Sequence, residues 1–385
     1  MKIGLLGFVV QDANKGCEAL TYSFLHLIRK HASEPVSIHF FVPIVPLDQL
    51  KKEFPEFEFT IGKIKLKDPK FRFVSLIRSC DFVCDVTCGD GFSDIYFPKN
   101  VFFTTLFKCI VEICGVPLYL LPQTYGPFKN KRLERFAKFA IKHSKGVYAR
   151  DIKSTKYVEK LAKVNVTNTT DLAFALPYND EFDVDNEKIN IGINVSGLLW
   201  NGGFTEKNQF GLTVDYKDYI NRLISVLKED VNIRIHLIPH VIENANDNID
   251  GDVKVCRLLS EKYNVLCAPA FSTPIEAKSY ISKMNVFIGA RMHSTIAAFS
   301  ANVPVIPFSY SRKFEGLYEN LKYPFLIHGC SDTTELAFEH TIEWINKREQ
   351  LQNRVNASMN QINTYLSIFE SDLENNIMYK EEEIK

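Results

Sequence analysis

The stretch "NVFIGARMHSTIAAFSANVPVIPFSY", residues 285–310, contains a complete strand–helix–strand unit. The apolar run at 285–289 predicts a buried strand, and the Ala-rich run at 293–300 predicts a helix that packs on it. A second apolar run, at 304–308, predicts the next strand. Two strands connected through a helix are typical of neighbouring parallel strands in one sheet. This stretch therefore predicts an α/β fold.

The same alternation of apolar strands and amphipathic helices extends over most of the chain, and it indicates parallel sheets covered by helices on both faces. In the first half we predict strands at 2–9, 36–42, 81–87, 117–121 and 145–149, and helices at 17–30, 99–113, 130–143 and 152–162. In the second half we predict strands at 189–195, 232–238, 264–267, 285–289 and 304–308, and helices at 215–229, 252–262, 273–283 and 293–300.

The length of 385 residues predicts two domains rather than one. A strand-poor stretch at 175–188 is typical of a linker. We therefore expect a first Rossmann-type domain over 1–180, a second over 181–335, and C-terminal helices with a charged tail over 336–385. In doubly wound folds ligands bind outside the carboxyl ends of the strands, so we expect the site in a cleft where the two domains face each other.

The composition is that of a soluble globular protein, with 46 Lys and Arg residues balanced by 46 Asp and Glu residues. This balance argues against a nucleic-acid or membrane surface, although a local patch is compatible with zero net charge. The first residues read as a strand rather than a signal peptide, and no run approaches the ~20 apolar residues of a membrane span. We expect a cytoplasmic protein. The nine cysteines have no framework spacing, which indicates reduced thiols, and no metal-binding motif is present.

Basic side chains follow three predicted strands of the second half. Arg291 and His293 come after the strand at 285–289, Lys313 after the following strand, and His240 after an earlier one. Arg grips a carboxylate or phosphate with two hydrogen bonds, and the helix N-terminus at 292–294 adds N–H donors. Together these groups suit an anionic small molecule. Taken singly, Arg291 and His293 fit a helix start equally well, and His240 fits an ordinary loop.

The equivalent positions of the first half carry Gly, Asn and Asp, residues that allow sharp turns or close approach to a ligand. They occur in the segments "QDANKGCEA" (11–19), "CGDGFSD" (88–94), "LPQTYGPF" (121–128) and "YARDIKS" (148–154). Turn glycines and a helix N-cap at Asp151 would explain them without a ligand. Neither a G-x-G-x-x-G nor a G-x-S-x-G motif is present.

Taken in order, these segments resemble the motifs of the polysaccharide pyruvyl transferase family. The matching segments are "NKGCEAL" (14–20), "DVTCGDGFSDIY" (85–96), "GVPLYLLPQTYGPF" (115–128), "YARDIKS" (148–154), "TTDLAFAL" (169–176), "IPHV" (238–241) and "GARMHSTIAAFSANVPVIPFSYSRKFEGL" (289–317). The glycine-rich loop departs from the family pattern, because Cys88 and Asp90 replace two of its glycines.

The resemblance implies a GT-B-like fold of two Rossmann-type domains. It implies an enzyme that transfers pyruvate from phosphoenolpyruvate onto two hydroxyls of a sugar as a ketal, with release of phosphate. Members of the family act on capsule, exopolysaccharide or cell-wall glycans, often lipid-linked at the cytoplasmic side. We therefore expect a sugar or lipid-linked glycan as partner, peripheral association with membrane-bound glycan machinery, no nucleic acid, and no metal or organic cofactor.

The chemistry of an enol phosphate suggests roles for the matching residues. We expect His293 to be the acid that protonates the methylene carbon, because the pKa of histidine lies near neutral pH. On the donor side we expect Arg291, Lys313, Ser294 and Arg150. The base that accepts the hydroxyl protons is left open among Asp94, Asp90 and His240. On the acceptor side we expect Asn14, Gly16, Glu18, Asp90 and Gln123.

Two other functions remain open at this point. A GT-B glycosyltransferase that uses a nucleotide sugar would also place cations and a helix N-terminus in the second domain, because the fold does not fix the function. A non-catalytic homologue could act in glycan assembly.

Overall fold

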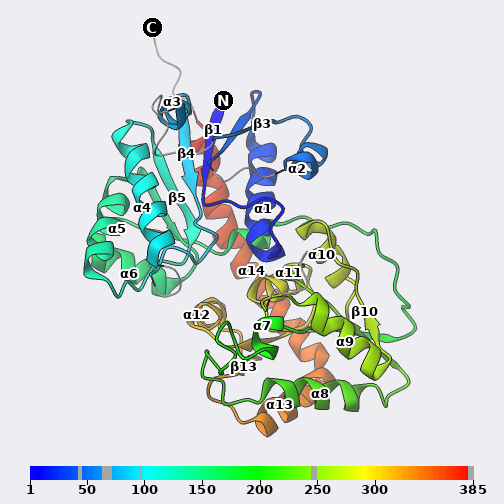
Figure 1. The fold of residues 1–385 in the computed structure, drawn as a ribbon. Helices are drawn as coiled ribbons and strands as arrows, with labels where there is room; N and C mark the ends of the chain where they lie inside the picture. Colours follow the sequence, from blue (N-terminus) through cyan, green and yellow to red (C-terminus); the bar gives the residue numbers. More distant parts are fainter. Residues whose placement is uncertain (42–45, 63–71, 95–97, 244–248, 380–385) are drawn as a thin grey trace. The chain divides into compact units, whose positions relative to one another are not determined.

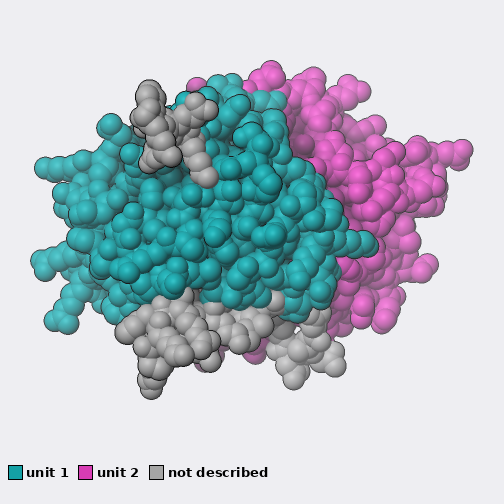
Figure 2. Space-filling model, turned by 90° about the horizontal axis from the view of Figure 1, so that it is seen from above, with its two compact units in different colours: residues 1–11, 20–172, 363–385 teal, residues 12–19, 173–362 magenta. Residues whose placement is uncertain are grey.

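A computed structural model describes residues 1–41, 46–62, 72–94, 98–243 and 249–379 of the chain. The chain forms two compact units (Figure 2). Unit 1 comprises residues Met1–Gln11, Leu20–Leu172 and Asn363–Lys385, and unit 2 comprises Asp12–Ala19 and Ala173–Ile362. A short segment that directly follows the first strand thus belongs to the second unit.

Unit 1 is built on a seven-stranded parallel sheet with the strand order β3-β2-β1-β4-β5-β6-β7. Its elements are β1 (Lys2–Leu6), α1 (Lys15–His31), β2 (Ser37–Phe41), α2 (Asp48–Glu53), β3 (Glu58–Ile61), α3 (Arg72–Arg78), β4 (Phe82–Asp85), α4 (Pro98–Ile113), β5 (Leu118–Gln123), α5 (Lys131–His143), β6 (Gly146–Ala149), α6 (Ile152–Ala162) and β7 (Thr167–Asn168). This is the strand order of the Rossmann fold, which reverses direction between β1 and β4.

Helices cover both faces of this sheet (Figure 1). The helices α4, α5 and α6 lie on one face, and α1 with the end of α14 (Arg348–Asp372) lies on the other. Helix α5 shows why such a segment folds as it does. Asn130 caps its N-terminus by accepting hydrogen bonds from Arg132 N and Leu133 N, and its Ala and Ile side chains face the core while its cations face solvent.

Unit 2 has a six-stranded sheet with the order β10-β9-β8-β11-β12-β13, and it is also parallel throughout. Its elements are β8 (Ile189–Asn194), α7 (Gly197–Trp200), α8 (Tyr216–Leu227), β9 (Ile233–Leu237), α9 (Val253–Tyr263), β10 (Leu266–Cys267), α10 (Pro274–Ile281), β11 (Val286–Gly289), α11 (Met292–Ser300), β12 (Val305–Ser309), α12 (Arg312–Asn320), β13 (Ile327–His328) and α13 (Thr334–Asn346). The strand order again reverses once, between β8 and β11.

The strand–helix–strand unit predicted from residues 285–310 forms the centre of this second sheet. Its two strands, β11 and β12, are paired in parallel with Phe287 opposite Val305, and both are buried. Helix α11 connects them and is buried along most of its length. The predicted α/β class with two doubly wound parallel sheets is confirmed.

Several elements differ from the sequence-based expectation. The strand predicted at 81–87 ends at Asp85, because Thr87 and Cys88 have φ angles of 39° and 52° in the left-handed region. Helices α2 and α3 and strand β3 were not predicted. Residue 42, at the end of the strand predicted over 36–42, and the charged tail at 380–385 lie outside the described residues. Within the described part of the chain, no helix is both long and apolar enough to cross a membrane.

Candidate active site

The predicted residues Arg291 and His293 lie in unit 2, next to the point where the strand order reverses. Strands β8 and β11 are neighbours, and their carboxyl ends are Asn194 and Gly289. Ligands of doubly wound sheets bind outside this point, because the loops on its two sides diverge and leave room. The chain leaves β11 through Arg291 and enters helix α11, in whose first turn His293 lies.

Arg291 is at the N-cap of α11, where a cation faces the positive end of the helix dipole. Two carboxylates offset this charge. Arg291 Nη2 donates to Asp252 Oδ1 at 2.7 Å, and Nη1 donates to Asp250 Oδ1 at 2.6 Å. Burial alone would lower the pKa of Arg291, but the two carboxylates raise it overall. The guanidinium of Arg291 is thus bound to carboxylates of the protein, whereas the sequence analysis expected it to bind the carboxylate or phosphate of a ligand.

Asp252 is the centre of this arrangement, and its side chain is fully buried. Besides Arg291, its oxygens accept backbone hydrogen bonds from Gly197 N at 2.8 Å and from His240 N and Val241 N at 3.0 Å each. One carboxylate therefore fixes the loops after β8 and β9 to the start of α11. A charged acceptor that receives several N–H groups forms strong hydrogen bonds.

Asn194, the last residue of β8, joins the same network. Its Oδ1 accepts from Arg291 N at 2.9 Å and from Ser294 Oγ at 3.1 Å, and its Nδ2 donates to Ile238 O at 2.9 Å. Ser294 Oγ is also within 2.8 Å of the carbonyl oxygen of Arg291, and the serine is buried. The hydroxyl of Ser294, predicted on the donor side, is thus bonded to the scaffold.

The segment after β1 pairs with the loop after β9 as a short antiparallel ladder within unit 2. Asn14 and Val241 form a bridge, Lys15 N donates to His240 O at 3.1 Å, and residue 242 donates to residue 13 at 2.7 Å. The side chain of Asn14 accepts from Gly16 N at 3.0 Å and so caps the start of α1. The predicted acceptor residue Asn14 therefore has a structural task in this segment.

This ladder brings Gly16 against His293. A Cβ atom at Gly16 would lie 2.4 Å from His293 Nδ1 and 2.6 Å from Cγ, which is closer than such atoms approach in proteins. Only glycine therefore fits beside the imidazole at this position. Two motifs separated by more than half the chain thus meet at the predicted catalytic histidine.

Glu18 and Lys15 form a buried ion pair on the first turn of α1, with Nζ 2.7 Å from Oε2. Lys15 Nζ also donates to Ser272 O at 3.0 Å, in the loop before α10. Glu18 was predicted on the acceptor side, and Lys15 was not singled out. The pair ties the segment containing Gly16 to the body of unit 2.

His240 is buried beside these cations. Burial lowers the pKa of His240 from 6.5 to about 3, and the nearby charges of His293, Arg291 and Lys15 add to the shift. The imidazole is therefore neutral at physiological pH. A group with so low a pKa is a weak base, so the structure does not favour His240 among the base candidates.

The buried neutral His240 predicts a stability that depends on pH. Between pH 6.5 and about pH 3 the unfolded chain binds a proton at this imidazole and the folded protein does not. Protonation therefore favours unfolding, and the free energy of unfolding should fall as the pH is lowered, by about 1.4 kcal/mol per pH unit from this residue. Urea unfolding of the wild type and of His240→Gln across this window measures it.

The variant should show a shallower loss of stability than the wild type. Comparison of the two slopes is needed because burial also lowers the pKa values of His26 and His236 to about 4. Equal slopes would contradict the assignment of His240 as a buried neutral group.

Lys313 lies in the first turn of α12, which follows β12, and it is half-buried. It shares the carboxyl edge of the sheet with His293, as predicted. Tyr310 lies between β12 and α12 and contacts Phe210, with ring centroids 5.0 Å apart. Tyr310 also contributes to the raised pKa of Arg291. The loop around Phe210 borders a pocket of about 400 Å³ that is also lined by Trp200 and Asp215.

The remaining predicted residues belong to unit 1. Arg150 is buried, its Nη1 is 2.7 Å from Asp171 Oδ2, and its Nε donates to Thr124 Oγ1 at 2.8 Å. Arg150 Nη2 is also buried, and it has no hydrogen-bond partner among the described residues. Buried donors in native proteins are nearly always satisfied, so this group is well suited to a ligand oxygen.

Asp94 and Gln123 have partners within unit 1. Both carboxylate oxygens of Asp94 accept backbone N–H groups, from Lys129 and Asn130 at 2.7 Å each. Gln123 is fully buried in β5, and its Nε2 donates to Asp85 Oδ2 at 3.1 Å. The structure thus gives both residues scaffold contacts. Asp90 lies in the turn after β4, whose Gly89 O accepts a hydrogen bond from Thr124 N at 2.7 Å.

The turn after β4 is strained. Thr87, Cys88 and Gly89 have successive φ angles of 39°, 52° and 81°, and a β-branched residue rarely adopts a positive φ. Buried polar contacts of Lys108 stabilise this turn. Lys108 Nζ lies 2.9 Å from Asp85 Oδ1 and 2.8 Å from Thr87 Oγ1. A Cβ atom at Gly89 would lie 3.0 Å from Nη1 of Arg150, so the turn passes close to that guanidinium. Such strain clusters at functional sites.

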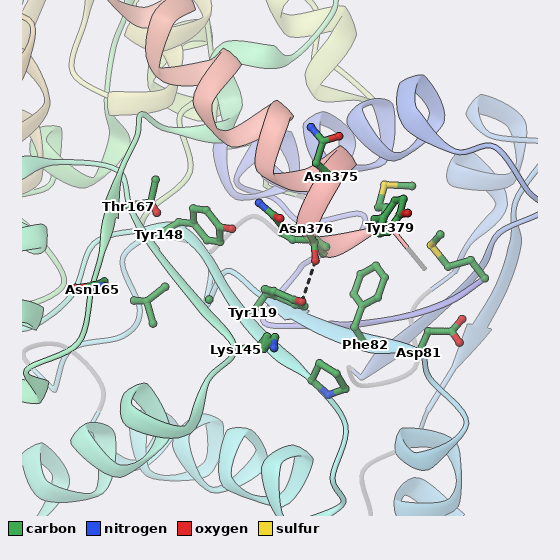
Figure 3. A pocket seen from close by; sticks show the side chains of 16 residues that line it. Asp81, Phe82, Tyr119, Lys145, Tyr148, Asn165, Thr167, Asn375, Asn376 and Tyr379 are labelled. Atoms are coloured by element: carbon green, nitrogen blue, oxygen red, sulfur yellow. Dashed lines mark hydrogen bonds between the residues drawn. The ribbon is translucent and has the colours of Figure 1, made fainter. Parts of the chain in front are cut away.

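A larger cavity, of about 800 Å³, opens in unit 1 on the opposite edge of the sheet (Figure 3). It is lined by residues that precede or begin strands, such as Asp81, Lys145 and Thr167, and by the end of the chain, where Asn376 O accepts from Tyr119 Oη at 3.3 Å. Because ligands of doubly wound sheets bind at the carboxyl edge, this cavity is not the candidate active site. The described residues contain no group of three or more His, Cys, Asp or Glu that could hold a metal ion.

Sequence reasoning missed Asp252, Asn194 and Lys15. Asp252 precedes α9 and reads as an ordinary helix N-cap, although its side chain caps nothing there. Asn194 is a polar residue at the carboxyl end of an apolar strand, and this contrast could have marked it as a candidate site residue. Lys15 lies in the segment 14–20 that matches a family motif. Its neighbours Asn14, Gly16 and Glu18 were predicted as site residues, and the same match could have pointed to Lys15.

Comparisons with known proteins agree with this architecture. A family model described as polysaccharide pyruvyl transferase matches residues 14–312. Comparison with curated protein sequences found no match. Among solved structures, a UDP-GlcNAc 2-epimerase from Neisseria meningitidis bound to UDP-GlcNAc is 13% identical, with a TM-score of 0.59, over 97% of this chain and 100% of its own.

Two further structures resemble the chain to a similar degree. MnaA of S. aureus, in a co-structure with UDP, is 13% identical over 95% of this chain and 97% of its own, with a TM-score of 0.57. UGT89C1 of Arabidopsis thaliana, complexed with UDP-L-rhamnose, is 10% identical over 97% and 99%, with a TM-score of 0.53. At such identities the likeness shows the fold alone, and that fold is GT-B. The family model covers most of the chain, and the chain belongs to the polysaccharide pyruvyl transferase family.

Proposed function

We propose that the protein transfers pyruvate from phosphoenolpyruvate onto two hydroxyls of a sugar, as a ketal, in the synthesis of a bacterial surface glycan such as a capsule or exopolysaccharide. The observation that carries the proposal is the contact between Gly16 and His293, because it joins two family motifs around one candidate acid at the carboxyl edge of the sheet. The acceptor is a free or lipid-linked sugar, and the reaction takes place on the cytoplasmic side. The scheme requires no metal or organic cofactor.

In this scheme His293 delivers a proton to the methylene carbon of the donor. C2 becomes electrophilic, one sugar hydroxyl forms the first C–O bond, and the second hydroxyl replaces the phosphate at C2. A base takes up each hydroxyl proton in turn and passes it on, so that one proton restores His293 and the other leaves with the phosphate. A positioned acid of this kind contributes about 10²–10⁴ in rate.

The donor carries a carboxylate and a phosphate, and both need cations. We propose Lys313 and Arg150 for this task, and the buried Nη2 of Arg150 supports its assignment. Arg291 has its guanidinium on Asp250 and Asp252. Its proposed role is therefore to hold the first turn of α11, and with it His293 and the backbone N–H groups next to Ser294, in place for the donor.

The sugar hydroxyls need a base. His240 has a pKa of about 3, and both oxygens of Asp94 already accept backbone hydrogen bonds. Asp90, in the turn after β4, therefore stays as the proposed base. Gly16, Glu18, Asn14 and Gln123 support the site through the scaffold contacts described above.

Gly16→Ala tests the contact that carries the proposal. The added methyl group would lie within 2.6 Å of the His293 ring, so the ring must move. Since a misplacement of about 1 Å can cost about 10²-fold in rate, we expect a kcat loss of about that size. Steady-state phosphate release measures it, with Cys17→Ala in the same segment as the control. A Gly16→Ala enzyme with unchanged kcat would contradict the proposed contact.

A binding comparison separates the proposed donor from the alternatives. Phosphoenolpyruvate should raise the thermal unfolding midpoint of the wild type, and Lys313→Ala and Arg150→Ala should remove this effect. Stabilisation by a UDP-sugar, with none by phosphoenolpyruvate, would favour a nucleotide-sugar glycosyltransferase. A lack of response to every donor, together with no phosphate release, would favour a non-catalytic homologue.

A further inference from the structure

Helix α5 of unit 1 and the residues next to it carry an unusual concentration of positive charge. Residues 129–145, which contain α5, include seven lysines and arginines but one glutamate, although the chain as a whole has 46 residues of each sign. Within α5, Lys131 pairs with Glu134 at 2.9 Å. Arg132, Arg135 and Lys142 are exposed and have no carboxylate partner among the described residues.

The same face exposes phenylalanines. Phe102 and Phe103 of α4 are 44% and 46% exposed, and Phe139 of α5 is 44% exposed. Phe102 contacts Phe136 across the two helices, with ring centroids 5.8 Å apart. The two helices lie side by side on one face of the sheet (Figure 1), so the aromatic groups and the cations form one surface, here called the α4–α5 patch.

We propose that the α4–α5 patch docks the protein on a membrane that contains anionic phospholipid. A helix with Lys and Arg on its polar side and exposed aromatic residues beside them lies in the plane of a lipid interface, with its rings among the acyl chains and its cations at the headgroups. The charge of the patch indicates an anionic surface as its partner. A protein of zero net charge is attracted to an anionic membrane only where its cations are clustered, as they are here.

Two other partners fit the patch less well. A second copy of the chain would bring like charges together around the phenylalanines. A nucleic-acid strand is usually held in a positive groove with open aromatic faces. Here Phe102 packs against both Phe103 and Phe136, which covers part of its ring, and the patch is made of two adjacent helices. The inference does not rest on the donor or on ketal chemistry.

Vesicle sedimentation of the full chain tests the proposal without any substrate. We expect the protein to sediment with vesicles of phosphatidylcholine mixed with phosphatidylglycerol and not with phosphatidylcholine alone, and we expect added salt to weaken the binding. The triple variant Arg132→Glu, Arg135→Glu, Lys142→Glu should bind on the order of a hundredfold more weakly or worse. The variant Phe102→Ser, Phe103→Ser, Phe139→Ser should also lose binding.

A matched control lies on α9 of unit 2, where Lys254, Arg257 and Leu258 are exposed. Lys254→Glu, Arg257→Glu, Leu258→Ser should bind vesicles as the wild type does. The proposal is overturned by equal binding to neutral vesicles, by an equal loss in the α9 control, or by no binding at all. It is also overturned if the patch instead mediates dimer formation in sedimentation velocity, or binds a labelled oligonucleotide while vesicles do not bind.

Phosphate release with a soluble sugar acceptor tests the proposed function separately from membrane docking. The patch variants should keep the wild-type rate on a soluble acceptor, since none of their residues belongs to the candidate active site. Vesicle binding without any turnover of phosphoenolpyruvate would support membrane docking by the α4–α5 patch and contradict the proposed reaction.

Discussion

Replacing His293 with alanine is expected to lower kcat for pyruvyl transfer by about 10²–10⁴-fold, because the enzyme would lose the acid that protonates the donor. The protein should remain folded, since His293 is only partly buried and alanine is a good helix former in α11. Phosphate release under saturating donor measures kcat, and circular dichroism checks the fold.

His340 is the matched control histidine. It lies on α13 in the same unit and stacks on Trp344, with ring centroids 5.0 Å apart. His340→Ala should keep the wild-type kcat. A folded His293→Ala enzyme that released phosphate near the wild-type rate would remove His293 from the role of acid.

Replacing Asp252 with alanine is expected to have the largest effect on stability. The change would leave the guanidinium of Arg291 with one carboxylate fewer, and the N–H groups of Gly197, His240 and Val241 without their acceptor. Removal of one partner of a buried ion pair typically costs about 3–5 kcal/mol. Urea unfolding of wild type and variant measures the loss.

Asp252→Asn keeps the shape of the side chain and removes its charge, so it should lose less stability than Asp252→Ala and still lose rate, because α11 is held less firmly. Asp218→Ala is the control. Asp218 makes an exposed ion pair with Arg222 at 3.7 Å, and such pairs contribute about 0–1 kcal/mol. Equal losses for Asp252→Ala and Asp218→Ala would contradict the central place given to Asp252.

The fold follows largely from hydrophobic patterning. The strand–helix–strand unit at 285–310 is found as predicted, since buried parallel strands are continuous apolar runs and their helices have a regular apolar face. The helix predicted from residue 273 begins there, because Thr273 caps α10 by accepting a hydrogen bond from Glu276 N at 3.2 Å. These features depend on residues close together in the sequence.

Features that depend on distant contacts were not predicted. Strand β3 is half-exposed at the sheet edge and its four residues give little periodicity. The strand predicted over 81–87 stops at Asp85, because the buried group formed by Lys108, Asp85 and Thr87 stabilises a left-handed turn that the local sequence does not indicate. The strain is offset by a lysine 21 residues further along the chain.

The candidate site shows the same division. His293, Arg291 and Lys313 could be placed at strand ends because the end of each strand is visible in the sequence. The partners of Arg291 could not, since Asp252 is 39 residues away and Asn194 is 97 residues away. For that reason an arginine that reads as an anion grip in the sequence is held by carboxylates in the structure. The pKa of His240 likewise depends on burial and on neighbours from other loops.

Mass spectrometry of the product formed in D₂O tests the central claim most directly. The enzyme would be incubated with phosphoenolpyruvate and candidate free or lipid-linked glycans, and released phosphate would be measured in parallel. The account predicts a pyruvate ketal whose methyl group carries one solvent deuterium, formed with one phosphate per ketal, and its loss in His293→Ala. A glycan product without solvent deuterium in the methyl group, or a glycan extended by a sugar from a nucleotide donor, would contradict it.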